Sequence, residues 1–205
     1  MKKSLTLISV VALVALAAAA CAKAPQDDVS AAQAEMDKAR QAKADTWAPT
    51  EYKAAEEALN AANSEIATQN DKWVKNYDKA KELLSKAKEE AGKASAAAAV
   101  NVEQAKKDAE TSLAAAEAAL TAADAAVKVA PRTKDSAADL AKMKQDLETY
   151  RSSLDAAKQA SGAGDYKQAL EKANSVKDEA TKITDEIEAA KKKLGARAAH
   201  PARKQ

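Results

Sequence analysis

The fold is decided by the stretch from Lys72 to Val129, which has the sequence KWVKNYDKAKELLSKAKEEAGKASAAAAVNVEQAKKDAETSLAAAEAALTAADAAVKV. It contains no proline, and Gly92 is its only glycine, so nothing else in it interrupts a helix. From Trp73 to Val127, apolar residues and alanines recur in 15 steps over 54 residues, a mean of 3.6 residues per step. This is the α-helical period, so we expect one helix about 80 Å long with a narrow apolar stripe.

The composition supports helices throughout the chain. Of the 205 residues 57 are alanine, whereas glycine and proline number four each and phenylalanine is absent. From Cys21 onward only 28 of 185 residues are Val, Ile, Leu, Met, Trp or Tyr, too few for a thick globular core. The sequence therefore excludes sandwiches, barrels and α/β sheets, and it predicts long helices joined along thin alanine-rich seams.

Turn residues divide the rest of the chain into further helices. Pro49 and Pro131 each end one helix and suit the first turn of the next. Ser161-Gly162-Ala163-Gly164 is expected to form a turn, and Gly195 stands where a glycine commonly ends a helix. Together with the long helix, the expected helices cover about residues 28–46, 50–69, 132–161 and 165–194.

The spacing of apolar residues on these helices predicts how they pack. Leu140, Met143, Leu147, Tyr150 and Leu154 follow one another at 3-4-3-4 spacing, the a/d pattern of a coiled coil. Short turns make successive helices antiparallel neighbours. We therefore expect an all-α fold: an elongated antiparallel helical bundle or coiled coil of two three-helix segments that share the long central helix. The segments would span 28–96 and 97–195, followed by a basic disordered tail at 196–205.

Two parts of the sequence resemble one another. Asn76-Tyr77-Asp78-Lys79-Ala80 is similar to Asp165-Tyr166-Lys167-Gln168-Ala169 at a spacing of 89 residues. The Ala-Pro pairs that end at Pro49 and Pro131 are 82 residues apart. The two spacings differ by one heptad, which adds two helical turns and keeps a buried face buried. An internal duplication explains this, although helices rich in Ala, Lys and Glu also align by chance.

The N-terminus has the pattern of an export signal. Lys2 and Lys3 precede an apolar run from Leu5 to Leu16 and a run of four alanines, which together indicate a signal peptide over residues 1–20. These two lysines account for the formal charge of +2, since the remaining 31 basic and 31 acidic residues balance. A neutral, evenly mixed surface gives no electrostatic footprint for nucleic acid.

Cys21, the only cysteine, directly follows the alanines and cannot form a disulfide within the chain. This arrangement resembles the lipobox of bacterial lipoproteins, with Ala18 where leucine is commonest. The resemblance implies cleavage before Cys21, acylation of Cys21 including a palmitate-type chain, and a short acylated tether at 21–27. It also implies the outer membrane, because Ala22 stands where an aspartate signals retention in the inner membrane. A plain secreted protein with a spare cysteine is the alternative.

A second resemblance covers about residues 28–95. Ala-Asp-Thr-Trp-Ala-Pro at 44–49, followed by Asn-Tyr-Asp-Lys-Ala at 76–80, is similar to a family of alanine-rich helical-hairpin envelope lipoproteins of unknown function. Residues 130–190 resemble a degenerate second copy. This family implies a structure and no activity. The sequence around Asp165 also resembles the second helix of a tetratricopeptide repeat, but helices of about 30 residues are too long for that 34-residue unit.

The residue types needed for catalysis do not come together in the sequence. The glycines form no phosphate-binding loop, and His200 is the only histidine, so neither a Ser-His-Asp set nor a multi-histidine metal site can be built. The carboxylate pairs Glu56-Glu57 and Glu89-Glu90 are adjacent in sequence, so their side chains diverge on a helix. We therefore expect no enzyme activity, no metal, no cofactor and no small-molecule substrate.

A few residues are candidates for contact with a partner. Trp47 and Trp73 are rare residue types here, although the simpler interpretation is that they cap the two ends of the first segment's core. Arg197, Arg203 and Lys204 could bind an anionic envelope polymer or lipid, or could belong to a solvated end. The four tyrosines fall on the apolar seams and are expected in the core.

These observations predict a non-catalytic helical spacer or scaffold that faces the periplasm and is held in the outer membrane through Cys21. The alternative is a binding or adaptor module for an envelope assembly partner or peptidoglycan. Self-association through the helix faces is also open, because Ala/Leu stripes pack equally well within one chain or between chains.

Overall fold

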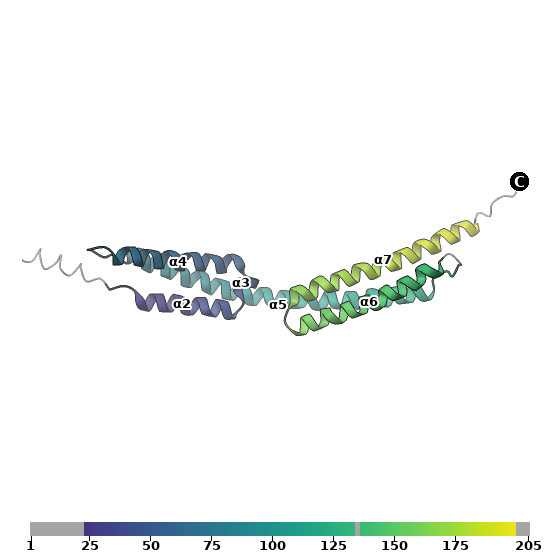
Figure 1. The fold of residues 1–205 in the computed structure, drawn as a ribbon, viewed down its shortest axis with the longest axis horizontal. Coiled ribbons are helices and arrows are strands. Elements are labelled where there is room, and N and C mark those ends of the chain that lie inside the picture. Colours follow the sequence, from purple (N-terminus) through teal and green to yellow (C-terminus); the bar gives the residue numbers. More distant parts are fainter. Residues whose placement is uncertain (1–22, 134–135, 200–205) are drawn as a thin grey trace, which may run out of the picture. The chain divides into compact units, whose positions relative to one another are not determined.

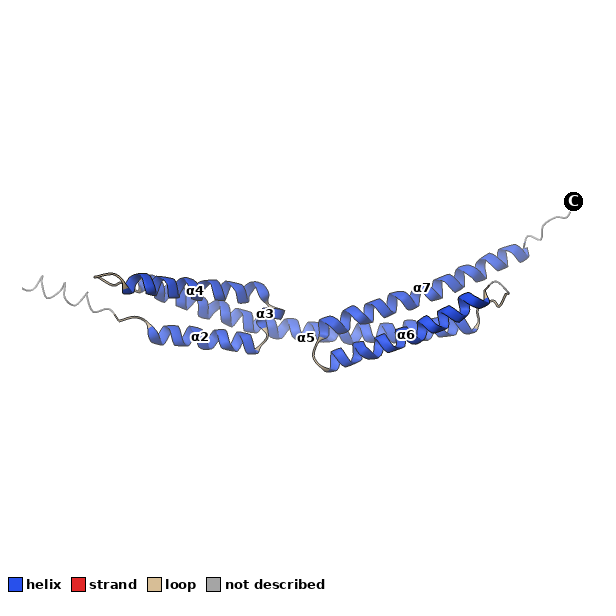
Figure 2. Ribbon diagram, in the orientation of Figure 1, coloured by secondary structure: helices blue, strands red, loops and turns tan. Residues whose placement is uncertain are grey.

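The structure is a computed structural model that describes residues 23–133 and 136–199. Every regular element in these two ranges is an α-helix, and neither range contains a strand (Figures 1 and 2). The helices are α2 (Gln26–Gln41), α3 (Ala44–Trp47), α4 (Pro49–Asn70), α5 (Asp78–Lys128), α6 (Ala137–Gly162) and α7 (Tyr166–Ala199). The predicted all-α fold is confirmed.

Contacts within the chain divide it into two units, and the boundary along the sequence lies between Asn101 and Val102. The first unit contains α2, α3, α4 and the part of α5 up to residue 101, and the second contains the rest of α5 with α6 and α7. The division predicted from the sequence lies between residues 96 and 97. α5 is continuous over 51 residues and passes through Gly92, so each unit has three main helices and α5 contributes to both.

The core of the first unit is a seam of small side chains. Met36, Tyr52, Leu59, Ile66 and Leu84 are its largest aliphatic and aromatic members besides Tyr77, and alanines fill most of the remaining positions. On α5 the completely buried members are Ala80, Leu84, Ala87, Ala91, Ala94 and Ala98. This run confirms the 3.6-residue stripe predicted for the long helix. Alanine lets helix axes approach closely, so each residue buries little area but packs without gaps.

The second unit has a core with more leucine and isoleucine. α5 contributes Leu120 and Val127, α6 contributes Leu147 and Leu154, and α7 contributes Ile183 among other residues. The remaining a/d positions predicted on α6, Leu140, Met143 and Tyr150, are partly buried against this core. The coiled-coil spacing therefore identifies the inward face of α6 correctly.

The first helix differs from the prediction of one helix over 28–46. α2 ends at Gln41, and the short α3 follows after a residue in the left-handed conformation, Lys43, with φ 54°. The amide of Lys43 donates a hydrogen bond to the carbonyl oxygen of Arg40 at 2.9 Å. A left-handed residue is a common way to end a helix, but it is usually glycine, so a lysine at this position gave no signal in the sequence.

Three helix ends also differ from the prediction. The long helix begins at Asp78 instead of Lys72, so Trp73 lies in a loop and is not part of the helical seam. α6 begins at Ala137, several residues after Pro131. α7 continues through Gly195 to Ala199, so Gly195 does not end the helix and residues 196–199 are helical. An α-helix accepts an isolated glycine at a cost of about 1 kcal/mol relative to alanine, which explains why Gly195 is not a stop.

The turn between α6 and α7 follows the predicted Ser-Gly-Ala-Gly sequence. Gly164 has φ 79°, its amide donates to the carbonyl oxygen of Ser161, and the amide of Asp165 donates to that of Ala160. This pair of bonds is a Schellman motif. The Asp165 carboxylate then accepts a hydrogen bond from the amide of Gln168 at 3.1 Å and so caps the start of α7. The similar sequence beginning at Asn76 also starts a helix.

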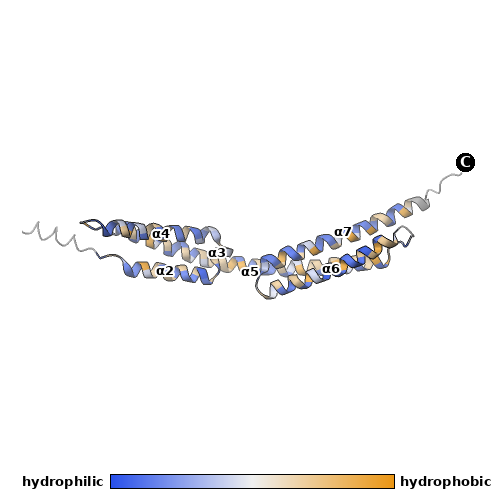
Figure 3. Cartoon of the chain, in the orientation of Figure 1, coloured by the Kyte–Doolittle hydropathy of each residue, from blue (hydrophilic) through white to orange (hydrophobic). Residues whose placement is uncertain are grey.

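Each helix is amphipathic. Figure 3 shows hydrophilic and hydrophobic residues interleaved along α2, α4, α6 and α7, which is the pattern of helices that bury one face only. Within the described ranges, no helix has an apolar stretch long enough to cross a membrane.

Candidate functional site

The first candidate site is the loop between α4 and α5, residues 71–77. Its two ends are fixed by side-chain hydrogen bonds. The Gln69 amide oxygen accepts from the backbone amide of Asn76 at 3.2 Å, and the Gln69 amide nitrogen donates to Glu65 Oε1 at 2.7 Å. Tyr77 Oη donates to Asn70 Oδ1 at 2.6 Å. Gln69 is buried and these bonds cross the base of the loop, so the loop is closed by specific contacts.

The tip of this loop exposes apolar side chains. Trp73 is 91% exposed and Val74 is 58% exposed, and they are flanked by the exposed Lys72 and the partly buried Lys75. The prediction that Trp73 caps the end of the first core is therefore wrong. The helix starts six residues later than predicted, which places Trp73 outside the packed seam and in solvent.

Trp47 lies against the core of the first unit, as the simpler interpretation predicts. It is partly buried against the core of the first unit, and its backbone carbonyl oxygen accepts a hydrogen bond from Asn101 Nδ2 at 2.7 Å. Trp47 stands at the end of α3, just before α4, and Trp73 follows the far end of α4. The structure therefore places the two tryptophans at opposite ends of a 22-residue helix and does not form one site from them.

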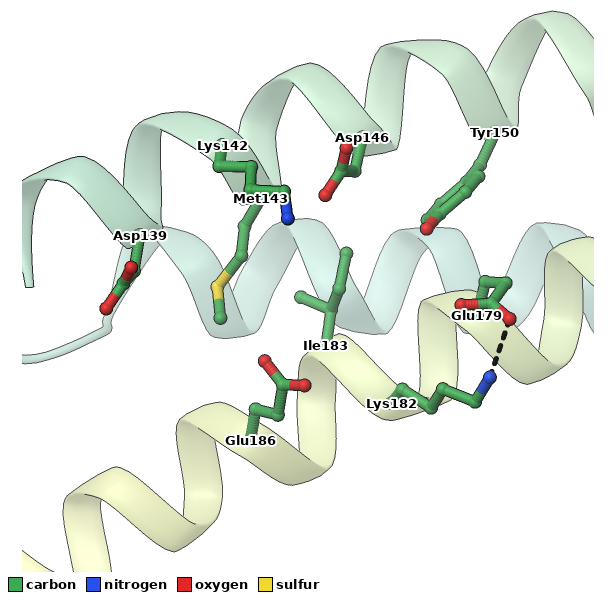
Figure 4. A pocket seen from close by; sticks show the side chains of 9 residues that line it. All are labelled: Asp139, Lys142, Met143, Asp146, Tyr150, Glu179, Lys182, Ile183 and Glu186. Atoms are coloured by element: carbon green, nitrogen blue, oxygen red, sulfur yellow. Dashed lines mark hydrogen bonds and ion pairs between the residues drawn. The ribbon is translucent and has the colours of Figure 1, made fainter.

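The second candidate site is a groove of about 360 Å³ between α6 and α7 in the second unit (Figure 4). α6 contributes Asp139, Lys142, Met143, Asp146 and Tyr150, and α7 contributes Glu179, Lys182, Ile183 and Glu186. Met143, Tyr150 and Ile183 also belong to the core of this unit or pack against it, so the groove has an apolar base and charged edges.

The groove carries four carboxylates and two lysines, which gives it a net negative charge. Lys182 Nζ lies 2.6 Å from Glu179 Oε1, and this ion pair raises the pKa of Lys182. Burial raises the pKa of Tyr150, and the charges of Glu179 and Asp146 raise it further. Tyr150 is therefore a protonated hydrogen-bond donor at neutral pH.

The lining of this groove suits the binding of a partner segment. Among residues 23–133 and 136–199, no group of three or more His, Cys, Asp or Glu side chains is placed to hold a metal ion. The carboxylates lie along the edges of an open groove. An apolar base with acidic edges fits a segment that presents an apolar side chain beside a cation.

Helix spacing could have identified this groove from the sequence. Asp139 and Asp146 are seven residues apart on α6, and Glu179 and Glu186 are seven apart on α7. Each pair flanks the coiled-coil seam of its helix, so like charges face one another where opposite charges usually pair. The prediction from adjacent carboxylates, Glu56-Glu57 and Glu89-Glu90, misses these residues.

For the remaining predicted site residues the structure describes at most the backbone. Cys21, Arg203 and Lys204 lie beyond the described ranges, as does His200. Arg197 belongs to α7. The expected acylation and the expected contacts of the basic tail therefore stay predictions.

Comparisons with known proteins add no assignment to this geometry. No family model, curated protein or solved structure matches the chain.

Proposed function

We propose that this protein is a lipoprotein held in the outer membrane by acyl chains on Cys21 and that it acts in the periplasm as a non-catalytic helical spacer or scaffold. The N-terminal sequence supports the anchor, because a basic start, a short apolar run and four alanines lead directly to the only cysteine. Several acyl chains at about 0.8 kcal/mol per buried methylene would make such attachment effectively permanent.

The observation that carries the spacer proposal is α5, a single helix of 51 residues that belongs to both three-helix units. At 1.5 Å per residue its length along the helix is about 77 Å. Buried alanines at its regular period line the first unit, and Leu120 and Val127 continue the packed face in the second. One uninterrupted helix that packs against other helices in both units suits a spacer, which acts through its length.

The anchor is tested by replacing the acylated residue. We expect Cys21→Ser to abolish incorporation of labelled palmitate in cells and to move the protein from the membrane fraction to the soluble periplasmic fraction. The variant should keep the helical circular dichroism of the wild-type protein. A wild-type protein that incorporates no palmitate would contradict the anchor.

The spacer proposal is tested by cross-linking in intact cells, followed by purification of the acylated protein and mass spectrometry of what accompanies it. A spacer should yield its own chain alone or no cross-linked product. It should also tolerate substitutions on its exposed faces and fail when one heptad is deleted from α5, because a seven-residue deletion shortens the helix and preserves its buried face.

The α6–α7 groove favours a second candidate function, that of an adaptor for an envelope partner or for peptidoglycan. An adaptor should tolerate the one-heptad deletion and should lose its partner when a local patch changes. Recovery of one discrete partner, cross-linked through residues such as Lys142 or Lys182, would support this function and contradict the spacer.

A further inference from the structure

We propose that the tip of the α4–α5 loop, residues 72–75, rests on the lipid bilayer that holds the acyl anchor, with Trp73 and Val74 inserted among the headgroups. This inference rests on the proposed acylation of Cys21. It gives the anchored end of the protein a second contact with the same membrane. The occupant of this exposed apolar tip is therefore a lipid surface.

The tip of the loop is exposed, but hydrogen bonds at the base of the loop restrict its conformation. Trp73 is 91% exposed, although tryptophan is the largest apolar side chain available to this core-poor sequence. The hydrogen bonds of Gln69 and Asn70 to Asn76 and Tyr77 close the base of the loop. A closed base limits the conformations of the four tip residues, so little further ordering is needed on contact with a surface.

The chain path brings this tip to the end of the unit where the N-terminal tether begins. α2 leads away from Gln26, the short α3 turns the chain, and α4 returns beside α2, so the α4–α5 loop and the start of α2 share one end (Figure 1). α2 has 16 residues and α4 has 22, which correspond to about 24 Å and 33 Å of helix. The returning helix is thus long enough to reach at least the level of Gln26.

The tether is short enough to keep the tip near the membrane. Gln26 is five positions after Cys21 in the chain, and an extended chain spans at most about 3.3–3.6 Å per residue. The anchor point and the start of α2 are therefore no more than about 18 Å apart. α4 is longer than α2 by about 9 Å of helix, which reduces the distance between the tip of the loop and the membrane.

The residue types at the tip suit a membrane interface. The indole of tryptophan has an apolar body and a polar N–H group, and tryptophan is enriched at the headgroup level of membranes. Lysine side chains on either side can lay their methylene groups along the acyl boundary while their ammonium groups stay at the phosphates. Lys-Trp-Val-Lys at 72–75 has both components in four residues.

The charges at this end of the unit favour a contact that depends on hydrophobic insertion more than on electrostatic attraction. Four acidic residues near the tip and tether offset the nearby lysines, and these acids are Asp27, Asp28, Asp71 and Asp78. Because the end has no basic excess, attraction to anionic lipid is weak here. The contact depends mainly on Trp73 and Val74, so it should form on zwitterionic bilayers and change little with salt concentration.

The chain offers a matched control for a fluorescence test, since Trp47 and Trp73 are its only tryptophans and lie at opposite ends of α4. Trp47→Phe leaves Trp73 as the reporter, and Trp73→Phe leaves Trp47. Each acylated full-length protein is purified from cells and reconstituted into phosphatidylcholine vesicles that contain lipid brominated near the headgroup. We expect the emission of Trp73 to shift to shorter wavelength and lose intensity, and the emission of Trp47 to do neither.

The outcomes separate this inference from the proposed function. An acylated, vesicle-bound protein whose Trp73 is neither shifted nor quenched overturns the inference and leaves the anchor intact. A protein that carries no acyl group overturns both. A photo-reactive amino acid in place of Trp73 identifies the occupant in cells: cross-linking to lipid supports the inference, and cross-linking to a second copy or to another protein overturns it.

Discussion

Asn101, the last residue of the first unit, donates a hydrogen bond from its side-chain amide to the backbone carbonyl oxygen of Trp47, 54 positions earlier in the chain, at 2.7 Å. The carbonyl groups at the end of a helix lack partners within that helix. α3 has only four residues, so a bond from α5 to its last carbonyl holds the turn between α2 and α4 against the long helix.

Asn101→Ala should lower the free energy of unfolding of the first unit by about 0.5–1.5 kcal/mol, the usual net contribution of one hydrogen bond. Both tryptophans belong to this unit, so tryptophan fluorescence during urea unfolding reports on it selectively. The control is Val100→Ala, since Val100 is 68% exposed on the preceding position of the same helix. Equal effects of the two substitutions would show that the hydrogen bond contributes nothing.

Lys43→Gly should stabilise the first unit by about 0.5–1 kcal/mol. Lys43 has φ 54°, a conformation that costs a residue with a side chain about 1–2 kcal/mol and that glycine adopts freely, although glycine also gains freedom in the unfolded chain. Lys88→Gly is the matched control, because Lys88 is an exposed lysine inside α5 and a glycine there should destabilise by about 1 kcal/mol. Urea unfolding followed by tryptophan fluorescence should give opposite signs for the two variants.

Ala94→Leu should destabilise the first unit by about 1–3 kcal/mol, because Ala94 is completely buried in a seam of small residues and a larger side chain forces the helices apart. Ala96→Leu, two residues along and exposed, should be nearly neutral. The comparison is made by thermal unfolding. A stabilising Ala94→Leu would mean that the alanine seam contains unfilled space.

The sequence determines the buried faces well. The 3.6-residue stripe from Ala80 to Ala98 and the heptad positions Leu147 and Leu154 are buried as predicted, because burial of one helix face follows directly from periodicity. The Gly164 turn was also predictable, since a left-handed residue after a helix is usually glycine.

The helix ends and the candidate sites were harder to predict. The helical pattern continues back to Trp73, but Gln69 and Asn70 form side-chain bonds to Asn76 and Tyr77 that close a loop and delay the helix until Asp78. Such bonds compete with helix formation and leave no trace in the apolar pattern. The α6–α7 groove does have a signal in the sequence, the seven-residue spacing of its carboxylates on each helix, but using it requires that α6 and α7 be paired as antiparallel neighbours.

The stability of the first unit should decrease in acid through Glu65. The hydrogen bond from Gln69 lowers the pKa of Glu65 below its ordinary value of 4.5, and Lys79, whose Nζ lies 3.5 Å from Glu65 Oε2, lowers it further. A lowered folded-state pKa stabilises the fold above about pH 4.5, and this contribution is lost as the pH falls through the folded-state pKa.

Glu65→Gln tests this dependence, since glutamine can still accept a hydrogen bond from Gln69. The variant should be less stable than the wild-type protein at neutral pH, and the difference should vanish in acid. Lys79→Met should retain part of the dependence, because the bond from Gln69 remains. The measurement is the urea concentration at the midpoint of unfolding, followed by tryptophan fluorescence, from neutral pH into acid. A constant difference at every pH would contradict the role of the Glu65 charge.

Asp146→Asn should lower the pKa of Tyr150, but not to its ordinary value of 10.0. Burial is the largest cause of the raised pKa and is unchanged by the substitution, whereas the charge of Asp146 is a smaller cause that the substitution removes. Asp139→Asn is the control, because Asp139 lines the same groove and is not among the groups that shift Tyr150. The pKa is measured from phenolate absorbance, with Tyr150→Phe used to identify the signal.

The same pKa determines how the second unit responds to alkali. A tyrosine whose pKa is raised on folding binds its proton more tightly in the folded state, so stability falls as the pH rises above about 10. Tyr150→Phe should remove this loss, and Asp146→Asn should reduce it. Helical circular dichroism during urea unfolding reports both units, whereas tryptophan fluorescence reports the first unit alone, because the second contains no tryptophan. The transition seen by circular dichroism and not by fluorescence therefore belongs to the second unit. If Asp139→Asn lowered the pKa as much as Asp146→Asn, the groove would act through its total charge and not through the carboxylates beside Tyr150.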